Sequence, residues 1–370
     1  RLSRPDKTAR RAQTRAWQRK DKLAKRDKDR ALLNSVGIRK LRENPIFLTP
    51  KRQLAYGGDD RSAGPPKLIT VDGVGSKPIG ALNEDRTCYV CREPFREIHF
   101  FYDQLCVRCG DFNHAKRDQA GDLRGRVALV TGSRVKIGYQ AAIMLLRSGC
   151  RVIVTTRFPR DAARRYAAET DAADWSHLLE IHGIDLRHIP SVEQLCDRLI
   201  ERHDRLDFIV NNACQTVRRP PGFYGHLMDA ELDTTARLSH AERGLLAAGA
   251  EVVTMQRDGT LPAAALSQVP LVAGDDDSSD ALFPVGTFDA DEQQVDRRDV
   301  NSWRLKMAEV PTVELLEVHL VNAVAPFLLN ARLKPLMLNE PSRDKHIVNV
   351  SAMEGQFYRT FKSDRHPHTN

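Results

Sequence analysis

From residue 126 onward, short apolar runs alternate with stretches whose apolar residues recur at helical spacing. Runs rich in β-branched residues predict five strands, at 127–130, 151–155, 178–184, 208–210 and 346–350. Helical spacing predicts helices at 139–147 and 313–336, and the capping box Ser191–Gln194 predicts the start of a third. Strands and helices in alternation are typical of an α/β fold with a doubly wound parallel sheet.

The turn between the first strand and the first helix has the features of a phosphate-binding site. It reads Thr131-Gly132-Ser133-Arg134-Val135-Lys136-Ile137-Gly138. Gly132 permits a tight turn, and Gly138 permits close approach of the backbone to a ligand. The helix that follows offers free N–H groups and a positive dipole end to a pyrophosphate. A nucleotide is therefore expected at this turn.

Further motifs stand at the ends of the later elements. Asp185-Leu186 follows the third strand, and Asn211-Asn212-Ala213 ends the fourth. Asn322 lies four residues before Pro326 on the long helix, and Ser351 follows the fifth strand. With the first turn, these motifs make residues 124–224 and 308–355 resemble the short-chain dehydrogenases/reductases. The resemblance implies a Rossmann-like fold and an oxidoreductase that moves a hydride between a nicotinamide cofactor and a carbonyl or hydroxyl substrate.

The resemblance also assigns roles to individual residues. It implies that the cofactor is bound by Thr131, Gly132, Ser133, Arg134, Lys136, Ile137, Gly138, Arg157, Asp185, Leu186, Asn211, Asn212 and Ala213. Asn322 is expected to support a proton relay, and Ser351 to orient the substrate. Tyr358 and Lys362 have the spacing of the family's Tyr–Lys pair but follow Ser351 too closely, so the pair is either these two residues or lies beyond Asn370.

The choice of dinucleotide depends on the end of the second strand. Thr155, Thr156 and Arg157 stand there without an acidic residue for ribose hydroxyls, and an arginine suits a 2′-phosphate. NADP(H) is therefore expected rather than NAD(H). Lys136 occupies the family's middle glycine position. Since lysine has a Cβ, an ordinary backbone conformation is expected there, with its ammonium either on a phosphate or in solvent.

Charge is distributed unevenly along the chain. Residues 1–52 contain eighteen Lys/Arg against five Asp/Glu, whereas residues 226–300 contain five against fifteen. The first segment predicts a basic helical arm, which either is simply solvated or binds nucleic acid, an anionic surface or the acidic insertion. Residues 53–84 form a Gly/Pro-rich linker. The Rossmann domain is expected at 122–370, and it contains an insertion at 226–305 that is a subdomain, a lid or an unstructured segment.

Four of the seven cysteines form two Cys-x-x-Cys pairs, Cys88 with Cys91 and Cys106 with Cys109, fourteen residues apart. This spacing predicts a structural Zn²⁺ site in a segment at 85–117, with His99 and His114 as packing residues rather than ligands. Disulfides are not expected between these cysteines, because a nucleotide-binding enzyme of this kind is expected inside the cell, where thiols stay reduced. A cytoplasmic location is accordingly expected.

Three expectations concern the whole molecule. No run of eighteen apolar residues is present, so no transmembrane helix is expected. The family often forms oligomers through the helix that carries Asn322, which suggests a homo-oligomer. The chain ends before the family's last strands, so a piece of a longer protein is expected, with an exposed sheet edge.

The alternative function is a silent dinucleotide sensor whose zinc and basic segments contact nucleic acid or a protein.

Overall fold

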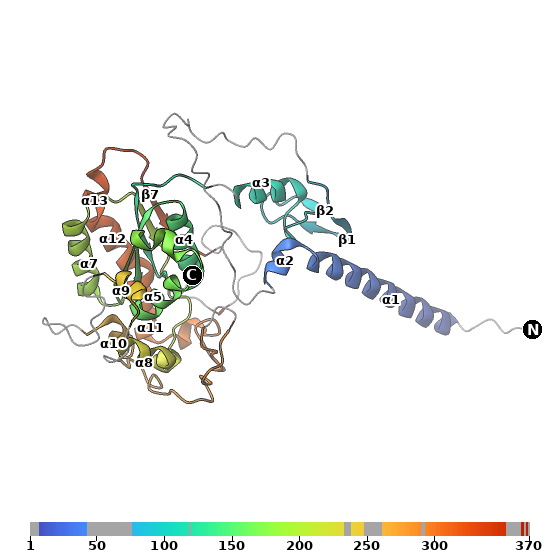
Figure 1. Cartoon of the computed structure of the whole chain (residues 1–370). Coiled ribbons are helices and arrows are strands. Elements are labelled where there is room, and N and C mark those ends of the chain that lie inside the picture. Colours follow the sequence, from blue (N-terminus) through green and yellow to red (C-terminus); the bar gives the residue numbers. More distant parts are fainter. Residues whose placement is uncertain are drawn as a thin grey trace, which may run out of the picture. The chain divides into compact units, whose positions relative to one another are not determined.

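The computed structural model describes residues 7–42, 76–117, 120–232, 238–247, 261–289, 293–352, 364–365 and 368. The chain divides into two compact units, Arg1–Ala120 (unit 1) and Gly121–Asn370 (unit 2), shown in Figure 1. Each unit has its own hydrophobic core and is described separately.

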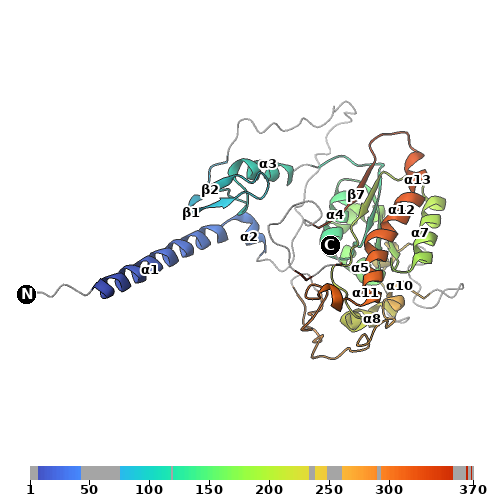
Figure 2. The ribbon, with the colours of Figure 1, turned by 180° about the vertical axis from the view of Figure 1, so that it is seen from behind.

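Unit 1 combines a long helix with a small hairpin module. Its elements are α1 (Lys7–Asn34), α2 (Gly37–Arg42), β1 (Gly80–Thr87), β2 (Pro94–Ile98) and α3 (Val107–Arg117). The strands pair antiparallel, and the last turns of α1 pack on β1, where Leu32 lies close to Gly80. Figure 2 shows the first turns of α1 running beyond the hairpin. Residues 10–20 are accordingly all exposed.

The boundary predicted between linker and zinc segment is wrong. Residues 43–75 lie outside the described part of the chain, but Gly80–Thr87 is strand β1 rather than linker. The polar residues of this strand concealed it, because they contact other polar groups instead of a core. Asp85 pairs with Arg96 across the hairpin at 2.5 Å, and the Asn83 amide donates to Asp29 of α1 at 2.7 Å.

Unit 2 is built on a five-stranded, wholly parallel sheet. Its strands are β3 (Val127–Thr131), β4 (Arg151–Thr156), β5 (Leu179–Gly183), β6 (Phe208–Asn211) and β7 (His346–Asn349). They lie in the order β5-β4-β3-β6-β7. This order corresponds to strands 3-2-1-4-5 of the doubly wound Rossmann order 3-2-1-4-5-6, so the predicted fold class is confirmed, as are all five predicted strands.

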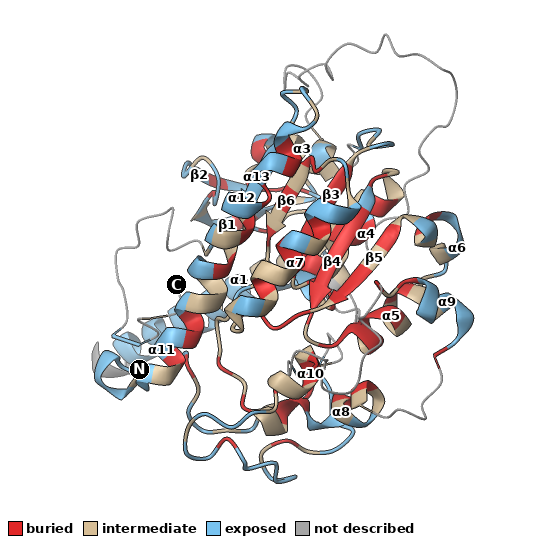
Figure 3. Cartoon of the chain, turned by 90° about the vertical axis from the view of Figure 1, so that its left-hand side faces the viewer, coloured by how far each residue is buried: buried red, intermediate tan, exposed pale blue. Residues whose placement is uncertain are grey.

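Helices cover both faces of this sheet, because side chains alternate between the faces along each strand. On one face Leu129, Ile153 and Ile209 pack against α7 (Ile189–Arg202) and α12 (Ala325–Arg332). On the other, Val130 and Val154 pack against α4 (Lys136–Arg147) and α5 (Pro159–Ala167). Figure 3 shows β3 and β4 almost entirely buried between these layers.

An ionic cluster ties the amino ends of the central strands together. Asp207, directly before β6, has no exposed surface and accepts hydrogen bonds from Arg126, Arg205, Lys345 and the backbone N–H of Val127. Burial raises the pKa of this carboxyl, but the surrounding donors outweigh burial and hold the pKa well below its usual range. At the sheet edge, the four residues of β7 are exposed.

Two helix predictions need correction. Helix α7 begins at Ile189, so Ser191 lies inside its first turn and its hydroxyl contacts the His188 ring at 2.7 Å instead of capping. The long helix is observed as α11 (Thr312–His319), the π-helical η4 (Leu320–Val324), α12 and α13 (Lys334–Leu338).

The helical run Thr312–Arg332 is long and apolar enough to cross a membrane by length and composition alone. A single run of this kind is weak evidence for a membrane span and gives no clear transmembrane segment. The same run also supplies Ala325 and Leu329 to the core under the sheet, and core helices of soluble proteins satisfy the same criterion.

The described part of the predicted insertion packs onto unit 2. Its elements are α8 (Gly225–Leu232), α9 (His240–Gly244) and α10 (Ala263–Leu266), preceded by η2 (Pro221–Tyr224) and followed by η3 (Met307–Glu309). Phe223, Leu227 and Phe283 form an apolar cluster with Phe158, which follows β4. Glu231 of α8 accepts the backbone N–H groups of Arg160 and Asp161 at the start of α5. The short α6 (Ala172–Trp175) and η1 (Ser176–Leu178) lie between α5 and β5 in the chain.

Candidate active site

A cavity of about 480 Å³ opens at the carboxyl ends of β3, β4 and β6. The strand order reverses there between β3 and β6, which is the position where doubly wound sheets bind ligands. Six basic residues line it, Arg134, Lys136, Arg157, Arg187, Arg218 and Arg219. The acidic residues of the lining are Asp185 and Glu317. The volume lies within the range of small-molecule sites, and the balance of charge suits an anionic ligand.

The turn after β3 is locked against the end of β6. The Thr131 hydroxyl accepts the backbone N–H groups of Asn212 and Ala213, each at 3.0 Å. The Asn212 amide donates to the carbonyls of Thr131 and Gly132, also at 3.0 Å. Thr131 therefore acts by holding the two strand ends together, while Gly132, Asn212 and Ala213 line the cavity.

Two glycines keep this turn free of side chains. Gly132 has a φ of 66°, and a Cβ there would lie 2.8 Å from the Ala213 Cα. A Cβ on Gly138 would lie 2.5 Å from the Gly132 carbonyl oxygen and would collide with the Asn212 side chain. Gly138 does not itself line the cavity but lets α4 begin against the turn. Backbone alone therefore forms this wall of the site.

Lys136 contradicts the expectation of an ordinary backbone. Its φ of 58° lies in the left-handed region that favours glycine. The chain thus keeps the conformation of the family's middle glycine although the residue has a Cβ, at a cost of roughly 1–2 kcal/mol. Lys136 and the exposed Ile137 both line the cavity at the start of α4. Strain of this kind concentrates at functional sites.

Ser133 and Arg134, both predicted to bind the cofactor, are directed elsewhere in this structure. The buried Ser133 hydroxyl donates to the Val130 carbonyl at 2.7 Å and does not line the cavity. Arg134 lines it, but its guanidinium donates to Asp161 at 2.7 Å and to Gln293 of the insertion at 3.0 Å. The main effect of Arg134 is to connect the turn to the insertion.

Arg157 is held at the cavity by an aromatic side chain that sequence reasoning missed. Its guanidinium lies 4.4 Å from the centre of the Tyr224 ring and donates to the Tyr224 hydroxyl at 2.5 Å. Tyr224 is buried against Phe158 and belongs to η2, 67 residues further along the chain. No local motif marks such a partner.

A chain of ion pairs crosses the floor of the cavity. Both carboxylate oxygens of Asp185 accept from Arg187, whose guanidinium also reaches Glu317 of α11 at 2.5 Å. Burial raises the pKa of Asp185, but the Arg187 hydrogen bonds and charge outweigh it and leave the pKa below its usual value. Glu317 also accepts from the buried Arg218, which pairs with Asp275 of the insertion. Asp185 and Leu186 line the cavity, as predicted, but Asp185 is already engaged.

The remaining predicted residues lie outside the lining. In the π-helical η4, the Asn322 side-chain oxygen accepts the Gln215 N–H at 2.7 Å, and its amide donates to the Gln215 carbonyl at 3.3 Å. Asn211 donates to Asn330 at 3.1 Å and to Asn349 at 2.8 Å, which joins β6 to α12 and β7. Ser351 is exposed after β7. Tyr358 and Lys362 lie outside the described residues.

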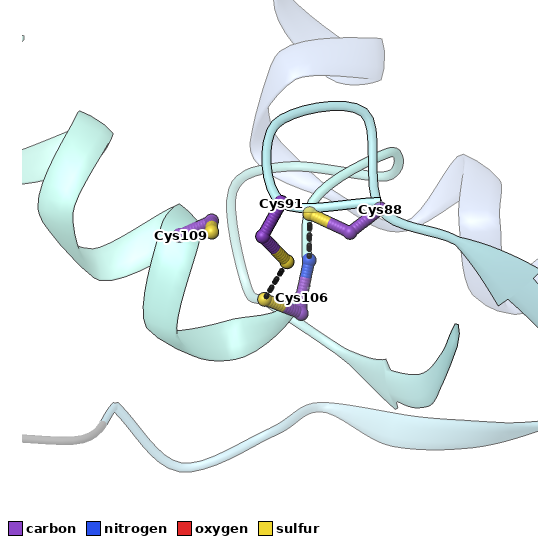
Figure 4. Close-up of side chains that lie close together, drawn as sticks. All are labelled: Cys88, Cys91, Cys106 and Cys109. Carbon is purple, nitrogen blue, oxygen red and sulfur yellow. Dashed lines mark hydrogen bonds between the residues drawn. The ribbon is translucent and has the colours of Figure 1, made fainter. Parts of the chain in front are cut away.

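The four cysteines of unit 1 converge, as Figure 4 shows. Their Sγ atoms all lie within 4.8 Å of one another, and those of Cys91 and Cys106 are 3.8 Å apart. Four thiolates on one tetrahedral Zn²⁺ with bonds near 2.3 Å are separated by roughly 3.8 Å. Burial opposes ionisation of Cys88, but backbone N–H donors, of Cys106 first, lower the pKa of its thiol to about 6. These donors favour the thiolate that a metal requires.

The nearby histidines have other partners. The His99 ring is fully buried against Gly110 of α3, and its Nδ1 accepts the N–H groups of Phe101 and Tyr102. Its Nε2 lies 3.2 Å from Asp111. His114 packs among aromatic rings, 4.8 Å from Phe100. Gly110 of α3 leaves room for the His99 ring, because a Cβ there would lie 2.5 Å from the His99 Cγ.

Comparison with known proteins finds a family match within the first half of unit 2. Residues 126–237 match the family described as short chain dehydrogenase. The chain is 30% identical to an uncharacterized protein of Acanthamoeba polyphaga mimivirus over 296 residues, 77% of this chain and 56% of that protein. It is 31% identical to retinol dehydrogenase 13 of Homo sapiens over 91 residues, 24% of this chain and 27% of that protein. It therefore spans little more than half of the viral relative.

A crystal structure of a metagenomic short-chain oxidoreductase in complex with NADP is also similar. The likeness has a TM-score of 0.39 at 20% identity and covers 67% of this chain and 70% of that one. The family match over residues 126–237 and the strand order of the sheet together show that unit 2 has the Rossmann-like fold of the short-chain dehydrogenases.

Proposed function

We propose that unit 2 binds NADP(H) and that the protein is an oxidoreductase acting on a carbonyl or hydroxyl substrate. One observation carries the proposal: a glycine-containing turn at the switch point of the sheet borders a cavity whose charged lining residues are mostly basic. The site fits a dinucleotide because glycine at 132 and 138 lets the turn after β3 pack closely against Ala213 and Asn212, which brings the free N–H groups at the start of α4 to the edge of the cavity.

The residues of this turn have distinct parts in holding the cofactor. The first N–H groups of α4 and the Lys136 ammonium would bind the pyrophosphate. Arg157, stacked on Tyr224, would bind the 2′-phosphate that distinguishes NADP(H) from NAD(H). The strand end before it offers only the side chains of Thr155 and Thr156, so no carboxylate repels that phosphate.

When bound, the nicotinamide supplies or accepts a hydride. The chain's own contribution is to fix the walls around it. Asn322 holds the Gln215 backbone at two points, and Glu317 neutralises both Arg187 and Arg218 below the cavity. The charged side chains of this wall are therefore held in place by their ion pairs. Proton transfer to the substrate would need a positioned hydroxyl, which the resemblance places in the Tyr–Lys pair, while Ser351 would orient the substrate.

The test is a titration of the full chain with NADPH and with NADH, followed by fluorescence of the reduced nicotinamide. Binding of NADPH at least tenfold tighter than NADH is expected, and Arg157→Leu should abolish the difference while leaving NADH binding intact. Turnover is then assayed on a panel of aldehydes and ketones. Failure of both dinucleotides to bind correctly folded protein would overturn the proposal.

A second candidate, dinucleotide binding without turnover, is favoured by the position of two residues. Asn322, predicted to support the proton relay, and Ser351, predicted to orient the substrate, do not line the cavity. Tight NADPH binding with no turnover on any carbonyl substrate would select this function. Turnover that is lost in Ser351→Ala would reject it.

For unit 1 we propose a structural Zn²⁺ bound by Cys88, Cys91, Cys106 and Cys109. Support comes from the mutual spacing of the four sulfurs and from the small core around them, which includes Ile98 and Leu105. Metal analysis of freshly purified protein should give about one equivalent of zinc. Cys106→Ser should lose the metal and unfold the hairpin module, whereas Cys196→Ser, in the core of unit 2, should retain it. Less than half an equivalent in the native protein contradicts the site.

A further inference from the structure

Helix α1 carries a continuous row of positive charge on one side. The helix contains eleven Lys/Arg and three Asp. Six of the cations follow one another at intervals of four, four, three, four and four residues: Arg11, Arg15, Arg19, Lys22, Arg26 and Arg30. At about 100° per residue these six (the basic row) lie within an arc of about 100° and extend about 28 Å along the helix. All six are exposed.

This arrangement is unfavourable for an isolated helix. Neighbours three or four residues apart on a helix lie side by side, and like charges there destabilise it by roughly 0.2–0.5 kcal/mol per pair. The basic row contains five such pairs. Two of the helix's carboxylates are engaged elsewhere, because Asp21 pairs with Lys25 at 2.7 Å and Asp29 accepts from Asn83 of the hairpin. An external polyanion would remove the repulsion.

The helix does not have the features of a membrane-binding helix. Its exposed large apolar residues are Trp17 and Leu23, which lie about 120° apart around the axis and form no stripe. Single-stranded nucleic acid is also disfavoured, since Trp17 is the one aromatic residue of α1 on which a base could stack. A straight row of cations suits instead the regularly spaced phosphates of a duplex, in which each strand carries one phosphate for about every 3.4 Å of the duplex axis.

We infer that unit 1 binds double-stranded nucleic acid along the basic row, through its phosphates and without reading sequence. The hairpin and four-cysteine module fixes the carboxyl-terminal end of α1 through Asp29 and Leu32, while residues 10–20 remain free of packing within the unit. This function is independent of dinucleotide binding by unit 2.

The test measures duplex affinity against salt, using the full chain and a fluorescein-labelled 20-base-pair DNA followed by anisotropy. Six phosphate contacts predict a slope of log Kobs against log salt of about −5. Arg15→Gln, Arg19→Gln and Lys22→Gln together should reduce the slope to about −3. The matched control changes Arg10, Lys20 and Lys28 to Gln, removing equal charge from the opposite sides of the helix, and should leave the slope near −5.

Folding of the variants is checked by far-ultraviolet circular dichroism, and glutamine is a good helix former. Replacing Arg15 and Arg19 by Lys keeps the charge and should retain the slope. If the salt slope falls equally in the row variant and in the control variant, the basic row is not the binding surface. Absence of duplex binding at 50 mM salt, or binding to phosphatidylserine vesicles without binding to DNA, would overturn the inference altogether.

Discussion

Lys136 offers a perturbation whose effects on stability and on binding should have opposite signs. Its φ of 58° costs a residue with a Cβ roughly 1–2 kcal/mol. Glycine removes that strain but loses about 0.5–1 kcal/mol more backbone entropy on folding. Lys136→Gly should therefore stabilise unit 2 by about 1 kcal/mol relative to Lys136→Ala, which keeps the strain. For a unit of this size the melting temperature would differ by roughly 2–4 °C.

The same two variants report on the cofactor. Both remove the ammonium that lines the cavity, so both should weaken NADPH binding by about tenfold, or about 1.4 kcal/mol. Stability is measured by urea denaturation followed through Trp175, which is buried in unit 2. Equal stability of the two variants would refute the left-handed conformation at residue 136. Unchanged NADPH affinity in both would show that Lys136 is a solvated turn residue.

Three further predictions concern unit 2. Gly138→Ala places a methyl group 2.5 Å from the Gly132 carbonyl, so NADPH affinity should fall at least tenfold in a fluorescence titration; unchanged affinity would contradict the cradle. Asp207→Asn should destabilise the protein at pH 7 by about 3 kcal/mol in urea, because Arg126, Arg205 and Lys345 lose the buried carboxylate that balances their charge. Since the folded pKa of Asp207 is depressed, its contribution is present above the unfolded pKa near 3.9, and the difference between wild type and variant should shrink as pH falls below that value. Burial raises the pKa of Glu231 to about 7 despite its backbone donors, so the folded state binds its proton more tightly than the unfolded state. Stability should therefore rise by up to about 3 kcal/mol as pH falls from 7 to 4.5, and Glu231→Gln should remove that slope; an unchanged slope in the variant would assign it to other groups.

The sheet could be predicted from the sequence because its central strands β3 and β4 are buried on both faces. Such strands read as continuous β-branched runs, as in Val127–Thr131 and Arg151–Thr156, and their alternation with helices fixes a parallel order. The hairpin of unit 1 could not be found in this way. Strand β1 is polar along most of its length and is stabilised by ion pairs and by α1, which period-2 alternation does not reveal.

The site could be located, but its internal contacts could not. The glycines and Asn212 belong to local motifs, so the position of the cavity followed from the order of motifs along the chain. The partners of Arg134, Arg157 and Arg218 lie 27 to 159 residues away, in helices and loops where no local motif marks them. Sequence reasoning also assigned Lys136 the backbone that its side chain prefers. The surrounding contacts, above all those between the β3 turn and β6, instead impose the glycine conformation.

The central claim is that a redox dinucleotide binds with its pyrophosphate at the Thr131 turn. Isothermal titration of the full chain with NADPH, in parallel with Gly138→Ala, tests it most directly. The account predicts saturable one-to-one binding that the substitution weakens at least tenfold without changing the circular dichroism spectrum. No heat of binding with folded protein at millimolar NADPH, or equal affinity in the two proteins, would contradict it.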